Sequence, residues 1–214
     1  VTVSGRVLLM NTEEMIARLR GTEFQVNDAS VKLMLKSILK EDPNIFWDVV
    51  VPYVKEHGLL DVSYLEIWPG EEFLLDLPLS VTEHIMVDNA QINWKLEAFS
   101  RFKEIKLISI SSSDLNELGL EEICRHGPFP NTMYLHFAGN YLGSAGLELL
   151  TDAKVFPNLR TLNLRSNHIQ HNGMVMFLET HAYASLKRIY VGNNPCTHYV
   201  IQKWSGRKGP IVSW

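Results

Sequence analysis

Four positions in the second half of the chain carry a polar residue at a constant interval of 27 residues. They are Ser113, Asn140, Asn167 and Asn194. A fixed period of this length indicates one supersecondary unit repeated along the chain, because a single unit cannot bury its own apolar face and must stack on its neighbours. The period therefore constrains the fold more strongly than any other feature of the sequence.

Apolar residues keep a constant spacing around each marker. The unit that begins at Leu159 follows the pattern L-x-x-L-x-L-x-x-N-x-L-x-x-x-G-x-x-x-L, with an apolar residue at every L. Counting from its first residue, positions one, four, six, eleven and nineteen are expected to form a continuous core, and Asn occupies position nine. A second column at the same interval supports the register: Phe102, Phe129, Phe156 and Tyr183.

This pattern resembles the leucine-rich repeat, and its interval and G-x-x-x-L segment look like the ribonuclease-inhibitor-like subclass. The resemblance covers roughly residues 102–204, about half the chain. It implies an α/β fold, a leucine-rich repeat solenoid with a curved parallel sheet on its concave side and helices outside. We expect four adjacent parallel strands in sequence order, near residues 106–110, 133–137, 160–164 and 187–191. Such a resemblance specifies fold strongly and function weakly.

The marker residues and the glycines have separate expected roles. A buried Asn amide both donates and accepts hydrogen bonds, so it can satisfy backbone groups of the turn after each strand and link one coil to the next. Ser113 keeps a hydroxyl with half that capacity, which predicts an imperfect ladder in the first clear repeat. The glycines at position fifteen are expected to allow a close approach or a positive φ: Gly119, Gly146 and Gly173.

Residues 1–57 are interpreted as a helical N-terminal cap, because the apolar end of a stack of repeats must be covered. Helices are expected at Asn11–Gly21, from Asp28 or Ser30 to the residue before Pro43, and at Asn44–His57, the last kinked or split by Pro52. Residues 58–204 form the expected solenoid, with degenerate repeats in 58–103 and clear repeats in 104–204. Strand-like pieces at Val62–Ile67 and His84–Val87 precede a helical segment at Trp94–Phe102. Residues 205–214 are expected to form a short C-terminal tail.

Composition favours an intracellular protein. Hydrophobic residues make up 46% of the 214 residues, yet no apolar run is long enough to cross a bilayer, and we expect no membrane association. The two cysteines, Cys124 and Cys196, do not make a disulfide framework and are expected to be buried small hydrophobic residues. A cytoplasmic location is favoured over a nuclear one. The chain begins with Val, which is compatible with a domain of a longer protein.

No arrangement of residues predicts an enzyme. Phosphate-binding loops, G-x-S-x-G and paired-cysteine metal motifs are all missing from the sequence. His168, His171 and His181 are the best metal candidates, but they lack an obvious carboxylate or thiolate partner and are interpreted as surface histidines. Cys124 and His126, two residues apart, would not face each other on a helix. We therefore expect no catalytic residue, no metal and no cofactor.

The concave sheet face is the predicted binding surface. Its side chains stand between the apolar positions of each strand, at positions two, three, five, seven and eight. The candidate partner-binding residues are Lys106, Tyr134, His136, Arg160, Asn163, Arg165, Lys187, Arg188 and Tyr190. In the columns compared, cations lie toward the third and fourth repeats and no carboxylate occurs. Arginine and tyrosine without acidic residues are typical of a recognition surface.

These columns favour a non-enzymatic module that binds a protein partner with an acidic patch. Residues 1–104 hold 17 Asp and Glu against 10 Lys and Arg, whereas residues 105–214 hold 7 against 10, so the repeat half is mildly basic. One alternative is nucleic-acid (RNA) binding, in which the same cations meet phosphates and the tyrosines stack on bases. Another is a regulatory or adaptor domain of a larger complex. The overall charge of −4 argues against avid nonspecific binding to nucleic acid.

Overall fold

The computed structural model describes residue 17 and residues 29–56, 61–77, 79–92, 97–152, 154–204 and 209–214. The chain divides into two compact units, Val1–Leu60 and Asp61–Trp214, and each is described by itself. The helix expected at Asn11–Gly21 lies outside the described residues. Whether residues 1–57 cap the repeats stays a prediction.

The first unit is helical in its described part. Helix α2 spans Ala29–Glu41, and a second helical stretch consists of α3 (Pro43–Ile45), the π-helical turn η1 (Phe46–Val50) and α4 (Val51–Glu56). Asp42 caps this stretch, since its carboxylate accepts from the backbone N–H groups of Asn44 and Ile45, at 3.1 Å each. Pro52 has no N–H and its ring crowds the preceding turn, which accounts for the widening of the helix just before it.

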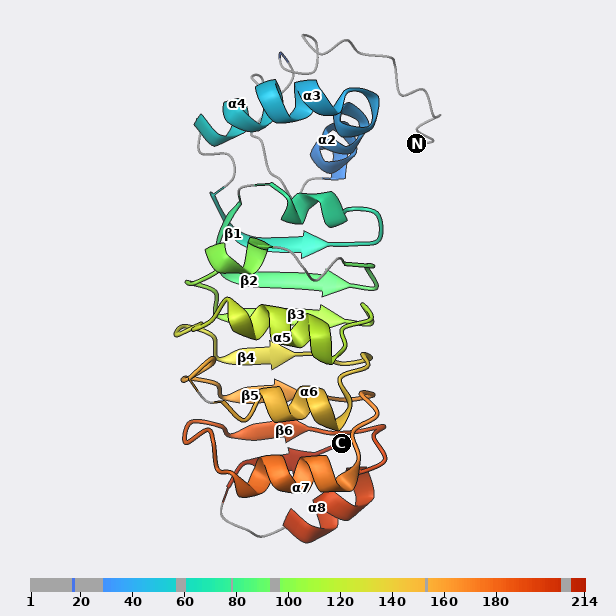
Figure 1. Ribbon diagram of the computed structural model, residues 1–214, viewed down its shortest axis with the longest axis vertical. Coiled ribbons are helices and arrows are strands. Elements are labelled where there is room, and N and C mark those ends of the chain that lie inside the picture. Colours follow the sequence, from blue (N-terminus) through green and yellow to red (C-terminus); the bar gives the residue numbers. More distant parts are fainter. Residues whose placement is uncertain are drawn as a thin grey trace, which may run out of the picture. The chain divides into compact units, whose positions relative to one another are not determined.

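The second unit is an α/β structure built on a single open sheet of seven parallel strands in sequence order (Figure 1). The strands are β1 (Asp61–Ile67), β2 (Ser80–Asp88), β3 (Leu107–Ser111), β4 (Tyr134–His136), β5 (Thr161–Asn163), β6 (Arg188–Tyr190) and β7 (Ile211–Ser213). Strands β3 to β6 coincide with the four predicted strands. Their register keeps the 27-residue interval, because Leu135 pairs with Ile108 on one side and with Leu162 on the other.

Each strand from β1 to β6 is followed by a helical segment, and the segments line up on the same face of the sheet (Figure 1). They are the 3-10 helices η2 (Glu72–Leu75) and η3 (Glu97–Arg101), then α5 (Glu117–Arg125), α6 (Gly143–Leu149), α7 (His171–Glu179) and α8 (Thr197–Trp204). The described part of the helical segment expected at Trp94–Phe102 is η3, and Trp94 itself is outside the described residues. Within the described chain, no helix covers the opposite face of the sheet.

The predicted strand pieces before the clear repeats are confirmed as β1 and β2. Leu65 pairs with Ile85, which pairs with Ile108, so the apolar L-x-L residues of the irregular segments continue the register of the clear repeats. All three are fully buried. The irregular spacing in the sequence therefore reflects connections of different length between strands that stack in the same way.

The core lies between the sheet and the helices. Every apolar residue at positions one, four, six, eleven and nineteen of the clear repeats is buried, as are the four members of the Phe/Tyr column. Thr132 fits the apolar position one of its repeat because its hydroxyl donates to the carbonyl of Ile105, at 2.8 Å. The buried hydroxyl of Thr132 is therefore paired.

Buried asparagines join successive turns, as predicted. The carboxamide oxygen of Asn140 accepts from the N–H groups of Ser113 and Leu115, and its nitrogen donates to three carbonyls, that of Ile110 at 2.7 Å among them. Asn194 bonds the preceding turn in the same manner through Asn167 and Ile169. At the first marker, the Ser113 hydroxyl accepts from Ala90 and donates to Ser111. The shorter side chain therefore makes the weaker ladder that the sequence predicts.

A left-handed residue precedes each marker, a feature that the repeat pattern does not predict. Ser112, Gly139, Ser166 and Asn193 all have positive φ, between 49° and 69°. The N–H of Ser112 donates to Ala138, that of Gly139 to Arg165 and that of Ser166 to Gly192, so the left-handed turn aims each N–H at the next coil. Small or polar residues at this position are the sequence signal, because they tolerate this conformation best.

Strand β7 differs most from the sequence expectation. Residues 205–214 were expected to form a tail, but Ile211–Ser213 pair with Arg188–Tyr190 in parallel and extend the sheet by one strand. Val191 donates its N–H to the carbonyl of Ser213, at 2.9 Å. The segment carries no marker at the repeat interval, so periodicity could not reveal it.

Candidate interaction surface

The sheet face without helices exposes two rows of side chains, which we call the open face. The register of the strands places Tyr64, His84, Leu107, Tyr134, Thr161, Arg188 and Ile211 in the first row. The second row holds Glu66, Met86, Ser109, His136, Asn163, Tyr190 and Ser213. Because strand side chains alternate between faces, the residues between these rows on β1 to β6 are buried.

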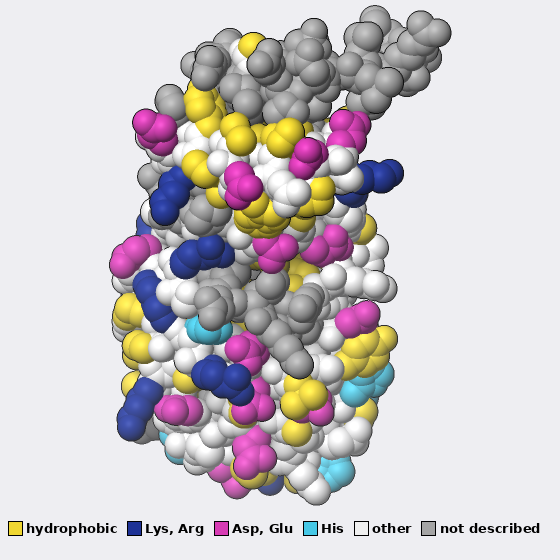
Figure 2. Space-filling model, turned by 45° about the horizontal axis from the view of Figure 1, so that its top comes forward, with side chains coloured by type: hydrophobic (Ala, Val, Ile, Leu, Met, Phe, Trp, Pro, Cys, Tyr) yellow, Lys and Arg dark blue, Asp and Glu magenta, His cyan; other side chains and the backbone are white. Residues whose placement is uncertain are grey.

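Five of the nine predicted binding residues belong to these rows. They are Tyr134, His136, Asn163, Arg188 and Tyr190, of which Tyr134 and Arg188 are exposed and the others half-buried. Three more cations, Lys106, Arg160 and Lys187, are exposed where β3, β5 and β6 begin. Figure 2 views the molecule from the helix side, and there too most Lys and Arg side chains lie toward the left edge, the side on which the strands of Figure 1 begin.

Arg165, the ninth predicted residue, makes contacts with other residues of the same chain. Its guanidinium lies over the Tyr190 ring, 4.5 Å from the centroid, and donates to the backbone carbonyl of Trp214. Trp214 in turn packs edge-on against His198, with ring centroids 4.9 Å apart. Arg165 therefore ties the segment after β7 to the open face, so a substitution there would disturb structure as well as any binding.

Carboxylates do occur on the open face, which corrects the expectation of a surface without acid. Strands β1 and β2 extend the face and bring Glu66, Glu83 and Asp88 to it or to its edge. Glu83 and Lys106 form an ion pair at 2.8 Å between two half-exposed side chains, and the Lys106 partner lowers the pKa of Glu83. The four clear repeats alone carry no carboxylate in these columns. The face is in fact acidic near β1 and β2 and basic near β5 and β6.

His136 lies at the centre of the open face. Its strand neighbours in the second row are Ser109 and Asn163. Partial burial lowers its pKa, since the charged imidazolium loses hydration. At neutral pH it therefore offers a neutral ring that donates and accepts one hydrogen bond each.

A hollow of about 200 Å³ lies on the open face where β1 to β3 end. We call it the acidic hollow, and the residues that line it are Glu66, Ile67, Trp68, Met86, Val87, Asp88, Ser109 and Ser111. Trp68 is held at its rim by a turn with the type II signature, in which Pro69 precedes Gly70 at φ 84° and the N–H of Glu71 donates to the Trp68 carbonyl. The Glu71 carboxylate also accepts from the Trp68 N–H, at 3.1 Å.

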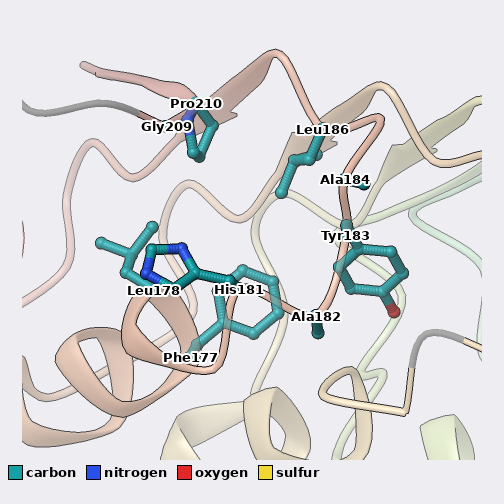
Figure 3. A pocket seen from close by; sticks show the side chains of 9 residues that line it. All are labelled: Phe177, Leu178, His181, Ala182, Tyr183, Ala184, Leu186, Gly209 and Pro210. Atoms are coloured by element: carbon teal, nitrogen blue, oxygen red, sulfur yellow. The ribbon is translucent and has the colours of Figure 1, made fainter.

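A second pocket, of about 390 Å³, lies between the end of α7, the following loop and Gly209–Pro210 (Figure 3). Its walls are mostly apolar, with Phe177 and Leu186 among them and His181 as a polar group. Burial raises the pKa of Tyr183, and its buried hydroxyl has no hydrogen-bond partner among the described residues. Figure 3 shows that hydroxyl pointing away from the other lining side chains. The pocket therefore lacks the convergent polar groups that orient a small ligand.

The candidate chemical groups named from the sequence do not assemble into a reactive site. Among the described residues, no three His, Cys, Asp or Glu side chains are placed to hold a metal ion. His168 stacks on Tyr141, with centroids 5.5 Å apart, and His171 packs against Tyr199. All three candidate histidines, His181 included, are exposed.

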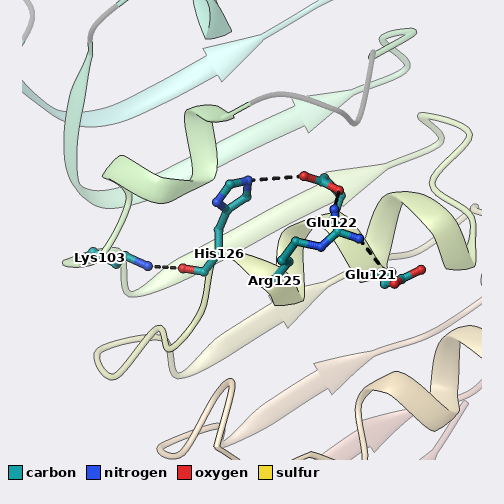
Figure 4. Close-up of polar contacts among 5 residues, drawn as sticks. All are labelled: Lys103, Glu121, Glu122, Arg125 and His126. Carbon is teal, nitrogen blue, oxygen red and sulfur yellow. Dashed lines mark hydrogen bonds and ion pairs between the residues drawn. The ribbon is translucent and has the colours of Figure 1, made fainter.

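The Cys124 and His126 pair is equally unsuited to nucleophilic chemistry. Burial raises the pKa of the Cys124 thiol to about 12, which keeps it protonated. The His126 ring turns toward Glu122, with 3.5 Å between Nε2 and Oε1, and its carbonyl accepts from Lys103 (Figure 4). Burial also raises the pKa of Cys196, to about 11. Both cysteines are free thiols, Cys196 buried and Cys124 half-buried.

Comparison with known proteins adds no assignment, since neither a protein-family model nor a curated protein matches the chain. None of the helices in the described part of the chain has the length and apolar character that a membrane crossing requires.

Proposed function

We propose that residues 58–204 form a leucine-rich repeat solenoid and that the chain is a non-enzymatic binding module, which holds a protein partner on the open face. The repeat assignment is supported by the strand register, which follows the 27-residue interval, and by the asparagines that bond one turn to the next. In this proposal residues 1–57 cap the first coil. An intracellular location remains the prediction from the sequence.

One observation carries the functional proposal: the sheet face that no described helix covers presents aromatic and charged side chains in rows. Tyr64, Trp68 and Tyr134 are each exposed by more than a third, and Arg188 stands beside Thr161 in the first row. Tyr and Arg are the residues that most often dominate binding energy in protein interfaces. A face of this composition, built on a rigid sheet, favours recognition of another macromolecule over chemistry.

Mixed charge favours a protein over a nucleic acid as the partner. Glu66 and Asp88 lie on the same face as Arg188, and a nucleic acid backbone running along the face would meet these carboxylates unfavourably. A protein surface can place acidic groups against the cations and basic groups against the carboxylates. RNA binding stays as the second candidate because Tyr134, Tyr190 and the cations near β5 and β6 suit base stacking and phosphate contact.

The test uses the full chain as bait and compares a double alanine variant of the open face with a single alanine variant of the helix side. Arg160→Ala with Arg188→Ala removes two cations from the basic end of the open face, and Arg125→Ala removes one from α5 on the helix side. Arg125 takes part in surface ion pairs with Glu121 and Glu122, which contribute little to stability. We expect the double variant to weaken capture of the natural partner at least tenfold and the α5 variant to leave it unchanged.

Salt dependence separates the two candidate partners. With a single-stranded RNA probe, each neutralised phosphate should contribute a slope of about −0.7 to a plot of log affinity against log salt. A protein partner should show a shallower dependence. Equal capture by wild type and by the Arg160 and Arg188 double variant, with unchanged folding, would refute the open face as the binding surface.

A further inference from the structure

The acidic hollow differs from the rest of the open face in being concave and acidic, and it is lined by a largely buried serine. Ser109 is only 9% exposed, although it stands on the outward side of β3 between the inward-facing Ile108 and Ile110. Among the described residues, its hydroxyl makes no hydrogen bond, and it lines the hollow. A hydroxyl that lines a hollow and has no protein partner is a group to which a ligand can form a hydrogen bond.

The charged groups at the hollow define the chemistry of what fits. Glu66 and Asp88 reach it from neighbouring strands, and Trp68, 49% exposed, also lines it. Carboxylates accept charge-assisted hydrogen bonds, and an indole face attracts a cation. The side chains of Ser109 and Ser111 add further acceptors. A cation with several donors is therefore the matching group.

The volume of the hollow suits a single side chain better than a whole small molecule. Pockets for small molecules and cofactors usually measure about 300–1,000 Å³. The hollow, at about 200 Å³, is smaller than that range and opens on the sheet face. Among protein side chains, the guanidinium of arginine combines a planar fork of donors with the capacity to stack on an aromatic ring, which an ammonium group shares only in part.

We propose that the acidic hollow receives an arginine side chain of the protein partner. The guanidinium lies against Trp68 and donates to Glu66 and Asp88, with Ser109 completing its hydrogen bonds. Arg160 and Arg188 at the other end of the open face then meet acidic groups of the same partner, so the partner surface carries a basic residue and an acidic patch in a fixed order across the strands. This inference rests on the proposed function of the open face.

The direct test uses capped tripeptides and the full chain. Acetyl-Gly-Arg-Gly-amide is titrated into labelled protein while the amide signals of Ser109 and Ser111 and the indole signal of Trp68 are followed by NMR. The citrulline peptide, which keeps the shape and loses the charge, is the ligand control. We expect the arginine peptide to shift these signals saturably and the citrulline peptide to bind at least tenfold more weakly.

Matched variants locate the effect on the protein side. The double variant Glu66→Gln with Asp88→Asn should bind the arginine peptide at least tenfold more weakly. Asp88→Asn alone serves as the milder variant if the double variant unfolds. Glu83→Gln is the control, because this carboxylate lies on β2 but outside the hollow, paired with Lys106. The proposal is overturned if the arginine peptide shifts no signal at the hollow, if citrulline binds equally well, or if Glu83→Gln weakens binding as much as the other changes.

Capture of the natural partner distinguishes failure of this inference from failure of the proposed function. If Arg160→Ala with Arg188→Ala weakens capture but Asp88→Asn and the double carboxylate variant do not, the open face binds the partner and the hollow receives no arginine. If none of these variants weakens capture, both proposals are wrong. Loss of capture with both sets of variants supports both.

Discussion

Substituting Asn140 by Ala tests whether the ladder holds the repeats together. Asn140 is 1% exposed, and its carboxamide oxygen accepts from the N–H groups of Ser113, at 3.0 Å, and Leu115, at 3.1 Å. Its nitrogen donates to Ile110 and Phe137 among others. Alanine removes all of these bonds and leaves the surrounding backbone in place.

The magnitude follows from the groups that lose their partner. The carbonyl of Phe137 keeps a bond from Asn167, at 2.6 Å, but the two buried N–H groups lose the acceptor that Asn140 supplied. Leaving a buried donor unpaired costs about 1–3 kcal/mol, so the free energy of unfolding should fall by about 2–6 kcal/mol. Asn163→Ala is the matched control. The Asn163 side chain is half-buried on the open face, and its carboxamide oxygen accepts from the Arg165 N–H, at 3.2 Å. Water can replace this bond, so we expect a loss below about 1 kcal/mol.

Urea unfolding measures both variants against wild type. Far-UV circular dichroism and tryptophan fluorescence should give coincident transitions, which is the condition for comparing unfolding free energies of a chain with two compact units. Equal losses for Asn140→Ala and Asn163→Ala would refute the reasoning, because the interior bonds would then contribute no more than a surface one.

Three further predictions concern packing, pH and thiol reactivity. Gly173→Ala should destabilise the protein by about 1–3 kcal/mol in urea, because the new Cβ would lie 2.5 Å from the Cβ of Ser144 and 3.1 Å from its Cα; adding Ser144→Gly should recover most of the loss. The folded pKa of His136 is lowered from 6.5, so its contribution to stability is complete above pH 6.5 and is lost as pH falls below it. His136→Gln should flatten that part of a melting-temperature profile, and an unchanged slope would contradict the assignment. Neither Cys124 nor Cys196, with pKa values raised to about 12 and about 11, should react with a thiol reagent at pH 8 in the native protein, and both should react in urea.

Sequence periodicity predicted the sheet because position and burial are linked by geometry. A residue such as Leu162 must face inward if the residues one repeat away also do, so a constant interval sets the register of β3 to β6 directly. The same logic gave β1 and β2 through Leu65 and Ile85, although their spacing varies. Strand β7 could not be predicted from the sequence, because it pairs through backbone groups and lacks a marker. The alternation in Ile211–Ser213 is too short to predict a strand.

The candidate site was predicted in its position and only partly in its composition. Columns of the clear repeats identified Tyr134, Arg188 and their neighbours, but the acidic hollow depends on Trp68 and Asp88, which lie in segments without a regular interval. Their place on the face requires the pairing register of β1 and β2. The turn signal Trp68-Pro69-Gly70 was visible in the sequence and marks the end of a strand, which is where a side chain can reach the rim of the face.

Separate faces of the same strands make stability and binding independently testable, with one exception. Along β3, Ile108 and Ile110 are buried while Ser109 points to the open face, so a change at an outward position leaves the core and the ladder unaltered. Arg165 breaks this separation, because it stacks on Tyr190 and holds the segment after β7 through the Trp214 carbonyl. A charge reversal there would weaken binding and the docking of β7 together. Arg160 and Arg188, whose side chains reach solvent at the same end of the face, are therefore the positions at which a loss of capture reports on recognition.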